Sequence, residues 1–232
     1  MWIAELWRYP VKSMAGEPLQ TVELLTSGFV GDRLVQVRNA RGRVLTSRTK
    51  PLLLGHHATL GSDGEPRVDG RPWDSTEVAR DVVRAAGEDA RLVRHEGPDR
   101  FDVLPLLVAT DGAVAALGYD RRRLRPNILV GGVPGLAERE WEGKTLVAGS
   151  VVIGVEDLRQ RCIMTTYDPD TLEQDRSVLL RIVHEFGGTI ALNCSVVRPG
   201  RLSVGDPVEL IDAPTGRAAG DQERISDSGV RE

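Results

Sequence analysis

A chain of 232 residues is long enough for one large domain or two small ones, and its 41% hydrophobic and 28% charged residues are ordinary for a globular protein. The net charge of −4 gives no general attraction to nucleic acids or anionic membranes, so we expect neither as a partner, although a local basic pocket is compatible with it. No apolar run reaches the roughly 20 residues of a membrane-spanning helix, and the start at Met1 lacks the pattern of a secretion signal. We expect a cytoplasmic monomer.

The first hundred residues alternate short apolar runs with turn signals, a pattern typical of short β-strands. Residues 34–37 and 44–47 are expected to pair as a hairpin around the turn at 39–42. After a capping residue among positions 74–76, a stripe of valines predicts a helix that ends at Gly87. Further strands are expected at residues 3–7, 58–60 and 67–68.

The second half begins after residues 95–99, a polar stretch with Gly and Pro that we take as the domain boundary. Asp111 is expected to cap a short helix that runs to Leu117, and residues 177–186 form an amphipathic helix pattern. Strands are expected at residues 128–130, 144–155, 190–197 and 207–211.

Many short strands with few helices predict barrel-like β domains rather than a parallel α/β sheet. We therefore expect a mainly β chain of the α+β class, with one domain at residues 1–97 and a second at 98–212. Residues 213–232 are rich in Gly, Asp, Arg and Ser and have little to bury, which predicts a disordered tail.

The chain has two cysteines, which is too few for a disulfide scaffold, and we expect both to be reduced. Cys194 lies in an apolar run that predicts a strand. Cys162 follows Arg161, and a cationic neighbour favours the thiolate, the form that binds metals and attacks electrophiles. No cysteine or histidine lies at zinc-site spacing. Cys162 could thus be a soft-metal ligand, a nucleophile or a small core residue.

A set of cationic and polar residues recurs at the ends of the expected strands. Each one alone is most simply a solvated surface group. Together they could build one anion site, because Arg forks and a Lys point charge suit phosphate. The set comprises Lys12, Ser13, Arg33, Arg48, Arg125 and Asn127.

These residues belong to an ordered series of short motifs that resembles the MOSC superfamily, named for the C-terminal domain of molybdenum cofactor sulfurase. The resemblance is greatest to two-domain members with an N-terminal MOSC β-barrel domain, such as the mitochondrial amidoxime-reducing component and its bacterial relatives. It extends to about Ile211. The motifs are Tyr9-Pro10-Val11-Lys12-Ser13, Gly31-Asp32-Arg33, Thr46-Ser47-Arg48, Phe101-Asp102, Arg125-Pro126-Asn127, Trp141-Glu142-Gly143, Arg161-Cys162, Asp168-Pro169 and Gly205-Asp206-Pro207-Val208.

The resemblance implies two MOSC β-barrel domains and a molybdenum cofactor, in which molybdenum is held by the dithiolene of molybdopterin. It makes Cys162 the protein thiolate ligand of the metal, in agreement with the match of sulfur ligands to molybdenum. The other implied cofactor-binding residues are Lys12, Ser13 and Arg33 at the phosphate and pterin, Arg125 and Asn127 on a second wall, Arg161 beside the ligand, and Thr110 and Arg48.

The implied function is an oxidoreductase that reduces small N-hydroxylated compounds. Some bacterial relatives append a ferredoxin-like domain with a cysteine cluster, which this chain does not contain, so a separate ferredoxin- or flavin-type donor protein would supply electrons. The alternative is a sulfur carrier or cofactor-handling protein that uses a Cys162 persulfide, and a third interpretation is a non-catalytic β-barrel with a buried cysteine. Family members often have Asp-Ala-Ser where this chain has Asp111-Gly112-Ala113.

Overall fold

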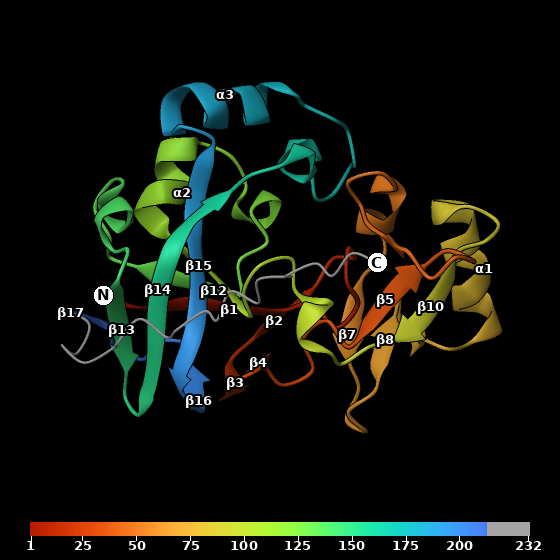
Figure 1. Cartoon of the computed structure of the whole chain (residues 1–232), viewed down its shortest axis with the longest axis horizontal. Helices are drawn as coiled ribbons and strands as arrows, with labels where there is room; N and C mark the ends of the chain where they lie inside the picture. Colours follow the sequence, from red (N-terminus) through yellow and green to blue (C-terminus); the bar gives the residue numbers. More distant parts are fainter. Residues whose placement is uncertain (213–232) are drawn as a thin grey trace, which may run out of the picture.

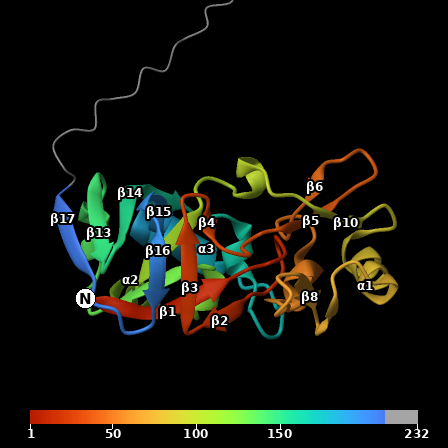
Figure 2. The ribbon, with the colours of Figure 1, turned by 90° about the horizontal axis from the view of Figure 1, so that it is seen from below.

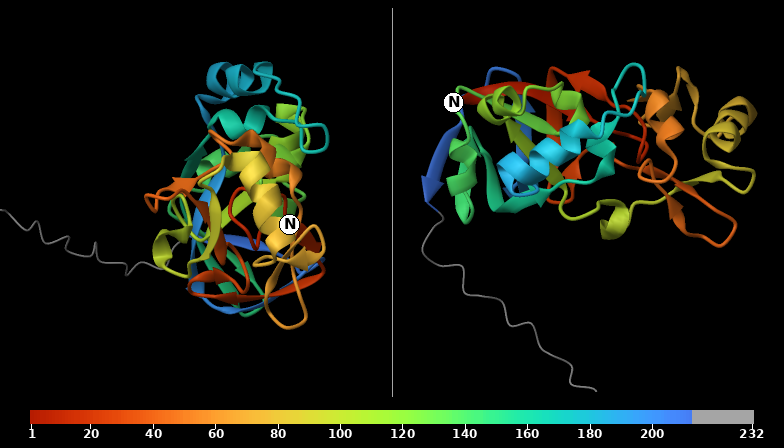
Figure 3. Two further views of the ribbon diagram at one scale, coloured as in Figure 1. Left: turned by 90° about the vertical axis from the view of Figure 1, so that its right-hand side faces the viewer. Right: turned by 90° about the horizontal axis from the view of Figure 1, so that it is seen from above.

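The computed structural model describes residues 1–212, and the tail expected at 213–232 lies outside the described residues. Figure 1 shows a large lobe and a small lobe side by side along the longest axis. The large lobe contains an eight-stranded sheet and two helices, α2 (Asp111–Leu117) and α3 (Ser177–Phe186). The small lobe contains α1 (Thr76–Ala86) and short strands. It lies at the end of the large lobe in the right view of Figure 3 and faces the viewer in the left view.

The large sheet is antiparallel except for the parallel pair β11 and β12. In spatial order its strands are β17 (Glu209–Asp212), β13 (Lys144–Ala148), β14 (Val151–Gln160), β15 (Thr189–Arg198), β11 (Leu106–Thr110), β12 (Ile128–Gly131), β1 (Trp2–Arg8) and β2 (Glu17–Leu19). The two end strands, β17 and β2, do not pair with each other, so the sheet lacks the closed ring of hydrogen bonds expected of a barrel.

Three small sheets complete the fold. Figure 2 shows one of them, with β3 at its centre, lying beside β1 and β2. The strands of this sheet are β16 (Gly200–Ser203), β3 (Thr21–Leu25) and β4 (Gly28–Phe29). The small lobe holds the sheet of β10 (Arg91–Arg94), β5 (Val35–Arg38) and β6 (Val44–Leu45), and that of β7 (Ala58–Leu60), β8 (Pro66–Val68) and β9 (Arg71–Pro72). Short 3-10 helices are η1 (Pro51–Gly55), η2 (Pro98–Arg100), η3 (Arg121–Arg123), η4 (Ala137–Glu140) and η5 (Ile163–Thr166).

The central strands β11 and β12 of the large sheet bury both of their faces. Val108 and Ile128 lie in the core between the large sheet and β3, whereas the neighbouring residues Ala109 and Leu129 lie in the core under α2 and α3. This alternation follows from the period of two along a strand. The small lobe has a separate core, in which the valine stripe of α1 packs on β5 and β8.

Side-chain hydroxyls cap the N-termini of α1 and α2. The Ser75 hydroxyl accepts a hydrogen bond from the backbone N–H of Val78 at the start of α1, as expected. The expected cap of α2 was wrong by one residue, because the Thr110 hydroxyl accepts from the Ala113 N–H. Asp111 instead accepts from the N–H groups of residues 112, 132 and 133, and thereby ties α2 to the loop after β12.

The structure confirms the predicted class, a mainly β chain with a few helices. Within residues 1–212 the three α-helices and ten of the seventeen strands lie where the sequence predicts them, while the 3-10 helices and the strands β2, β3, β4, β9, β10, β11 and β16 were not predicted. The boundary placed between residues 97 and 98 stays a prediction, and β1 pairs with β12 across it. No helix within residues 1–212 has both the length and the apolar character needed to cross a membrane.

We predict that Gly112→Ala destabilises the fold. A Cβ at Gly112 would lie 2.2 Å from the carbonyl oxygen of Val133 and 2.4 Å from that of Gly135, and neither backbone oxygen can move freely. Overpacking of this kind costs about 1–3 kcal/mol of unfolding free energy, measurable by urea denaturation. The exposed Ala115→Ser on the same helix is the control and should change stability by less than about 0.5 kcal/mol. Equal stability of the two variants would contradict the packing explanation.

Candidate functional site

A cavity of about 780 Å³, including its open mouth, is lined by four residues between positions 12 and 46 and by sixteen residues between positions 101 and 193. It brings together seven of the nine predicted site residues, although up to 150 positions separate them in sequence: Lys12, Ser13, Arg33, Arg125, Asn127, Arg161 and Cys162. Arg48 lies outside the lining but pairs with Asp102, which belongs to it. Thr110 is fully buried, caps α2 and does not line the cavity.

Cys162 is a half-buried residue that directly precedes η5. Its carbonyl accepts hydrogen bonds from the N–H and the hydroxyl of Thr165, at 3.1 and 2.9 Å, which fixes the backbone that carries the thiol. Cys194 lies in β15 in the core, where burial raises the pKa of its thiol well above the usual range. Both cysteines are free thiols. The structure therefore presents Cys162 to the cavity and keeps Cys194 as a core residue.

Three of the predicted residues adopt a left-handed backbone conformation. Ser13 has φ 74°, and Arg33 and Arg125 both have φ 55°. Non-glycine residues rarely occupy this region, and each such residue costs about 1–3 kcal/mol, so they persist where the surrounding structure enforces them. All three line the cavity, which makes this backbone a candidate for ligand binding.

The cavity wall carries six cationic side chains and, within the described residues, one carboxylate, that of Asp102. The cations are Lys12, Arg33, Arg123, Arg125, Arg159 and Arg161. Burial lowers the pKa of the Arg125 and Arg159 guanidinium groups below the usual range and that of Arg161 to about 10. Desolvation and like charges at close range destabilise the charged forms, which an anionic ligand would reverse.

Neutral oxygen atoms position four of these cations. Backbone carbonyls accept from Lys12 (Arg100 O, 2.8 Å), Arg125 (Met14 O, 2.7 Å) and Arg161 (Leu124 O, 2.7 Å), and the side-chain amide of Asn193 accepts from Arg159 at 3.3 Å. Lys12 and Arg159 also pair with Asp102, and the remaining two cations pair with the carboxylates of Asp32 and Asp168. Within residues 1–212, Arg125 and Arg161 are therefore held in a fixed geometry without an ion pair that cancels their charge.

Arg161 provides the most direct sign of a missing acceptor. Its Nε atom is buried and has no hydrogen-bond partner within residues 1–212, while Nη2 donates to Leu124. A buried donor without a partner costs about 1–3 kcal/mol, and more when it is charged. Arg161 precedes Cys162 and interacts electrostatically with its thiol. An anionic acceptor bound beside Cys162 would satisfy this donor.

Asp32 organises the part of the cavity wall that contains Arg33 and Asn127. Its fully buried carboxylate pairs with Arg33 and accepts from the Tyr9 N–H at 2.7 Å and from the Asn127 amide at 3.1 Å. Arg33 and Arg125 lie over the Tyr9 ring, 5.2 and 4.4 Å from its centroid. Burial raises the pKa of Tyr9 to about 12, so this ring stays neutral between the two guanidinium groups.

Asn127 has a structural part in this wall. Its amide nitrogen donates to Trp7 O and to Asp32, and its amide oxygen accepts from the Leu107 N–H at 3.2 Å. The side chain thus links β1, β11 and the start of β12. Its polar atoms are already engaged by protein groups, so it positions the wall.

Sequence reasoning missed three charged residues of the cavity, Arg123, Arg159 and Asp102. Arg159 lies two residues before Arg161, and the period of two along a strand would have placed both on one face. Arg123 belongs to a run of arginines that reads as a charged helix end, yet it is almost fully buried. Asp102 was part of a recognised motif, but its sequence context gives no sign of its three cationic partners.

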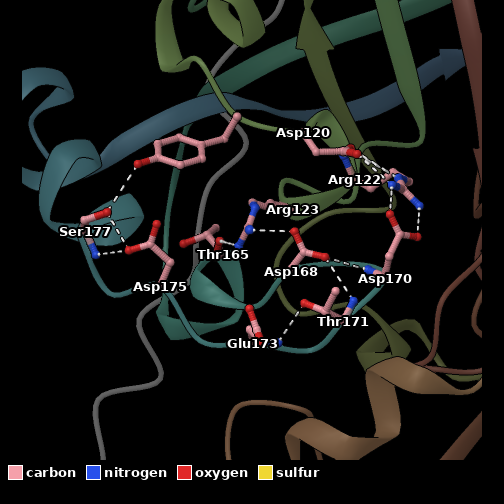
Figure 4. A network of polar contacts seen from close by, with 11 residues as sticks. Asp120, Arg122, Arg123, Thr165, Asp168, Asp170, Thr171, Glu173, Asp175 and Ser177 are labelled. Atoms are coloured by element: carbon pink, nitrogen blue, oxygen red, sulfur yellow. Dashed lines mark hydrogen bonds and ion pairs between the residues drawn. The ribbon is translucent and has the colours of Figure 1, made fainter.

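Arg123 and its neighbour Arg122 fix the loop that follows Cys162, as Figure 4 shows. Arg123 binds the Asp168 carboxylate at 2.9 Å and Arg122 binds that of Asp170 at 2.6 Å. The loop also forms the wall of a second, more apolar cavity, which shares Arg123, Arg125 and Met164 with the first. The network in Figure 4 therefore shapes both cavities.

Comparison with protein families agrees with this architecture. Residues 1–113 match the MOSC N-terminal beta barrel domain, and residues 110–209 match the MOSC domain. The chain belongs to the MOSC-domain family. Both parts of the cavity wall lie within these two matched segments, so the site is built from the N-terminal domain and the MOSC domain together.

Curated relatives align with this chain over most of their length. Mitochondrial amidoxime reducing component 2 of Macaca fascicularis is 26% identical, over 89% of this chain and 82% of that protein. Mitochondrial amidoxime-reducing component 1 of Homo sapiens is 25% identical, over 90% and 82%. The crystal structure of the YuaD protein from Bacillus subtilis superposes with a TM-score of 0.48 at 16% identity, over 92% of this chain and all of that chain.

We predict that Asp168→Asn makes the protein less sensitive to acid but less stable at neutral pH. Hydrogen bonds from the N–H groups of Thr171 and Asp170, together with Arg123, lower the pKa of Asp168. The stabilisation is present above the unfolded-state pKa of about 4 and is lost as the pH falls through the lower folded-state pKa. Melting temperatures between pH 7 and about pH 2 test this, with the exposed Glu209→Gln as control. An Asp168→Asn profile parallel to that of the unmodified chain would contradict it.

Proposed function

We propose that this MOSC-domain protein binds a molybdenum cofactor through Cys162 and reduces small N-hydroxylated compounds. The observation that carries the proposal is the juxtaposition of the Cys162 thiol with six cations in one cavity, including the unpartnered buried Nε of Arg161. The amidoxime-reducing names of the relatives support the reaction class.

The donor set of the cavity fits a molybdenum–molybdopterin group. Its phosphate and dithiolene are anionic, and they suit Lys and Arg donors and a soft thiolate. Lys12, Ser13 and Arg33 would hold the phosphate and pterin, with Arg161 and Arg125 beside the sulfur end. When bound, the cofactor supplies the redox and oxygen-transfer chemistry. Within residues 1–212, no group of three or more His, Cys, Asp or Glu side chains is placed to hold a metal ion, so the remaining metal ligands would come from the cofactor.

The proposed reaction needs two electrons and two protons to convert an N–OH group into N–H and water. We propose that a separate ferredoxin- or flavin-type protein supplies the electrons, which agrees with the word component in the names of the relatives. The cationic wall would hold the cofactor while the open mouth admits the small substrate.

Replacement of the two cysteines is the direct test. Cys162→Ser should lose molybdenum-dependent reduction of an amidoxime in the presence of a supplied donor, and the fold should persist because the side chain is half-buried. Cys194→Ser should retain the molybdenum-to-protein ratio, because its thiol lies in the core. Metal analysis and a reductase assay measure both. Unchanged activity in Cys162→Ser, or loss of molybdenum confined to Cys194→Ser, would contradict the ligand assignment. A Cys162-dependent sulfane-sulfur signal without molybdenum would identify a sulfur carrier instead.

We predict that Arg161→Gln weakens retention of the cofactor by roughly tenfold or more, because a hydrogen bond to a charged group contributes about 1.5–3 kcal/mol. The exposed Arg41→Gln makes the same charge change away from the cavity and serves as the control. Molybdenum and pterin content after dialysis measures retention. Equal content in both variants would show that Arg161 does not contact the cofactor.

A further inference from the structure

Asp102 lies in the segment that connects η2 to β11, and four consecutive residues of this segment, 101–104, line the cavity. Its carboxylate has cationic partners on three sides. Lys12 Nζ lies 2.8 Å from Oδ1, and Arg48 Nη2 and Arg159 Nη2 lie 2.9 and 3.5 Å from Oδ2. The three partners come from the turn after β1, the turn after β6 and the end of β14. Residues far apart in the chain thus converge on one carboxylate.

The charges of this cluster do not balance. Three cations surround one carboxylate, and the other acceptors of Lys12 and Arg159 are the neutral oxygens of Arg100 and Asn193. The Asp102 side chain is one-third exposed, so water can solvate it if it moves away from its partners. Although burial acts to raise the pKa of Asp102, Lys12, Arg48 and Arg159 hold it below the usual range, so the carboxylate is ionised at neutral pH.

A phosphate-type anion has the properties that this cluster favours. It offers more oxygen acceptors and more negative charge than a carboxylate, and it suits both Arg forks and a Lys point charge. Such an anion must share or replace the contacts that Asp102 makes, since Lys12 and Arg48 donate hydrogen bonds to it and Arg159 forms an ion pair with it. Removing the carboxylate while retaining the cations would therefore favour the anion.

We propose that Lys12, Arg48 and Arg159 form an anion subsite and that Asp102 is its built-in competitor, displaced when a phosphate group binds. The proposal rests on the proposed function in that the cofactor carries such a phosphate. The competition itself applies equally to inorganic phosphate and does not need molybdenum. Asp102 thereby limits the affinity of the subsite, and its displacement links occupancy of the cavity to the segment between η2 and β11.

The test measures the affinity of inorganic phosphate at low ionic strength by isothermal titration calorimetry, using the full chain. Asp102→Asn should bind phosphate roughly fivefold to tenfold more tightly than the unmodified chain, because it removes the competing charge. The control is Asp99→Asn, which makes the same charge change three residues away, at an exposed side chain outside the cavity lining. It should stay within about twofold of the unmodified chain. Equal or weaker phosphate binding by Asp102→Asn would overturn the proposal, and would show instead that the Asp102 carboxylate holds the three cations in position.

A measurement on the unmodified chain keeps the test independent of how well the variant folds. Phosphate titration followed by ¹⁵N NMR should shift the backbone amide signals of Asp102 and Val103 with the midpoint found by calorimetry and leave Asp99 unchanged. Absence of shifts at residues 102–103 at saturating phosphate would overturn the proposal.

The molybdenum content of the variants distinguishes a failure of this proposal from a failure of the proposed function. Tighter phosphate binding by Asp102→Asn together with higher cofactor retention assigns the subsite to the phosphate of the cofactor. Tighter phosphate binding with unchanged retention assigns it to free phosphate. A chain that never contains molybdenum but shows the phosphate effect would contradict the proposed function and leave the competitor role of Asp102 standing.

Discussion

Concentration of like charge in one partly buried cavity is the constraint on which the rest of this structure depends. Six cations share a wall with a single carboxylate among the described residues, so desolvation and mutual repulsion both act against them. Carboxylates pair with four of the cations, whereas neutral acceptors fix Arg125 on Met14 O and Arg161 on Leu124 O. The positions of Arg125 and Arg161 are thereby set while their charge remains available to an anion.

The same constraint explains why two lobes form one site. The turn after β1 contributes Lys12 and Ser13, the segment between β4 and β5 contributes Arg33, and the end of β14 contributes Arg159, three residues before Cys162. The hydrogen bond from Asn127 to Asp32 connects the two parts through the core. Left-handed backbone at Arg33 and Arg125 turns these side chains toward the shared Tyr9 ring. Strain at these positions is offset by the packing around them.

Sequence patterns predicted the α-helices and about half of the strands, but not the partnerships between residues. The valine stripe of α1 and the apolar period of α3 are local signals, and both helices lie where they were expected. The structure places Cys162 and six other residues of the predicted site in one cavity, and their role in binding a cofactor stays a prediction. Strands β3 and β16 were missed because pairing between distant segments defines them.

The roles of several residues could not be predicted from the sequence, because contacts between distant segments determine them. Arg123 reads as a solvated helix end, yet Asp168 and the Thr165 carbonyl hold it in the wall. Thr110 was expected near the cofactor, but its hydroxyl accepts a hydrogen bond from the backbone N–H of Ala113 at the start of α2. Gly112 departs from the family pattern at a point where the backbone of the loop after β12 passes too close for a Cβ. No local pattern reports such contacts.

Molybdenum K-edge X-ray absorption on the purified chain tests the central claim most directly, because it counts the sulfur atoms around the metal. Binding through Cys162 predicts one sulfur ligand beyond those of the dithiolene, and loss of that one sulfur in Cys162→Ser while Cys194→Ser keeps it. A sulfur shell that is unchanged by Cys162→Ser, or a chain that takes up no molybdenum when the cofactor is supplied, would contradict the assignment of this cavity as a molybdenum site.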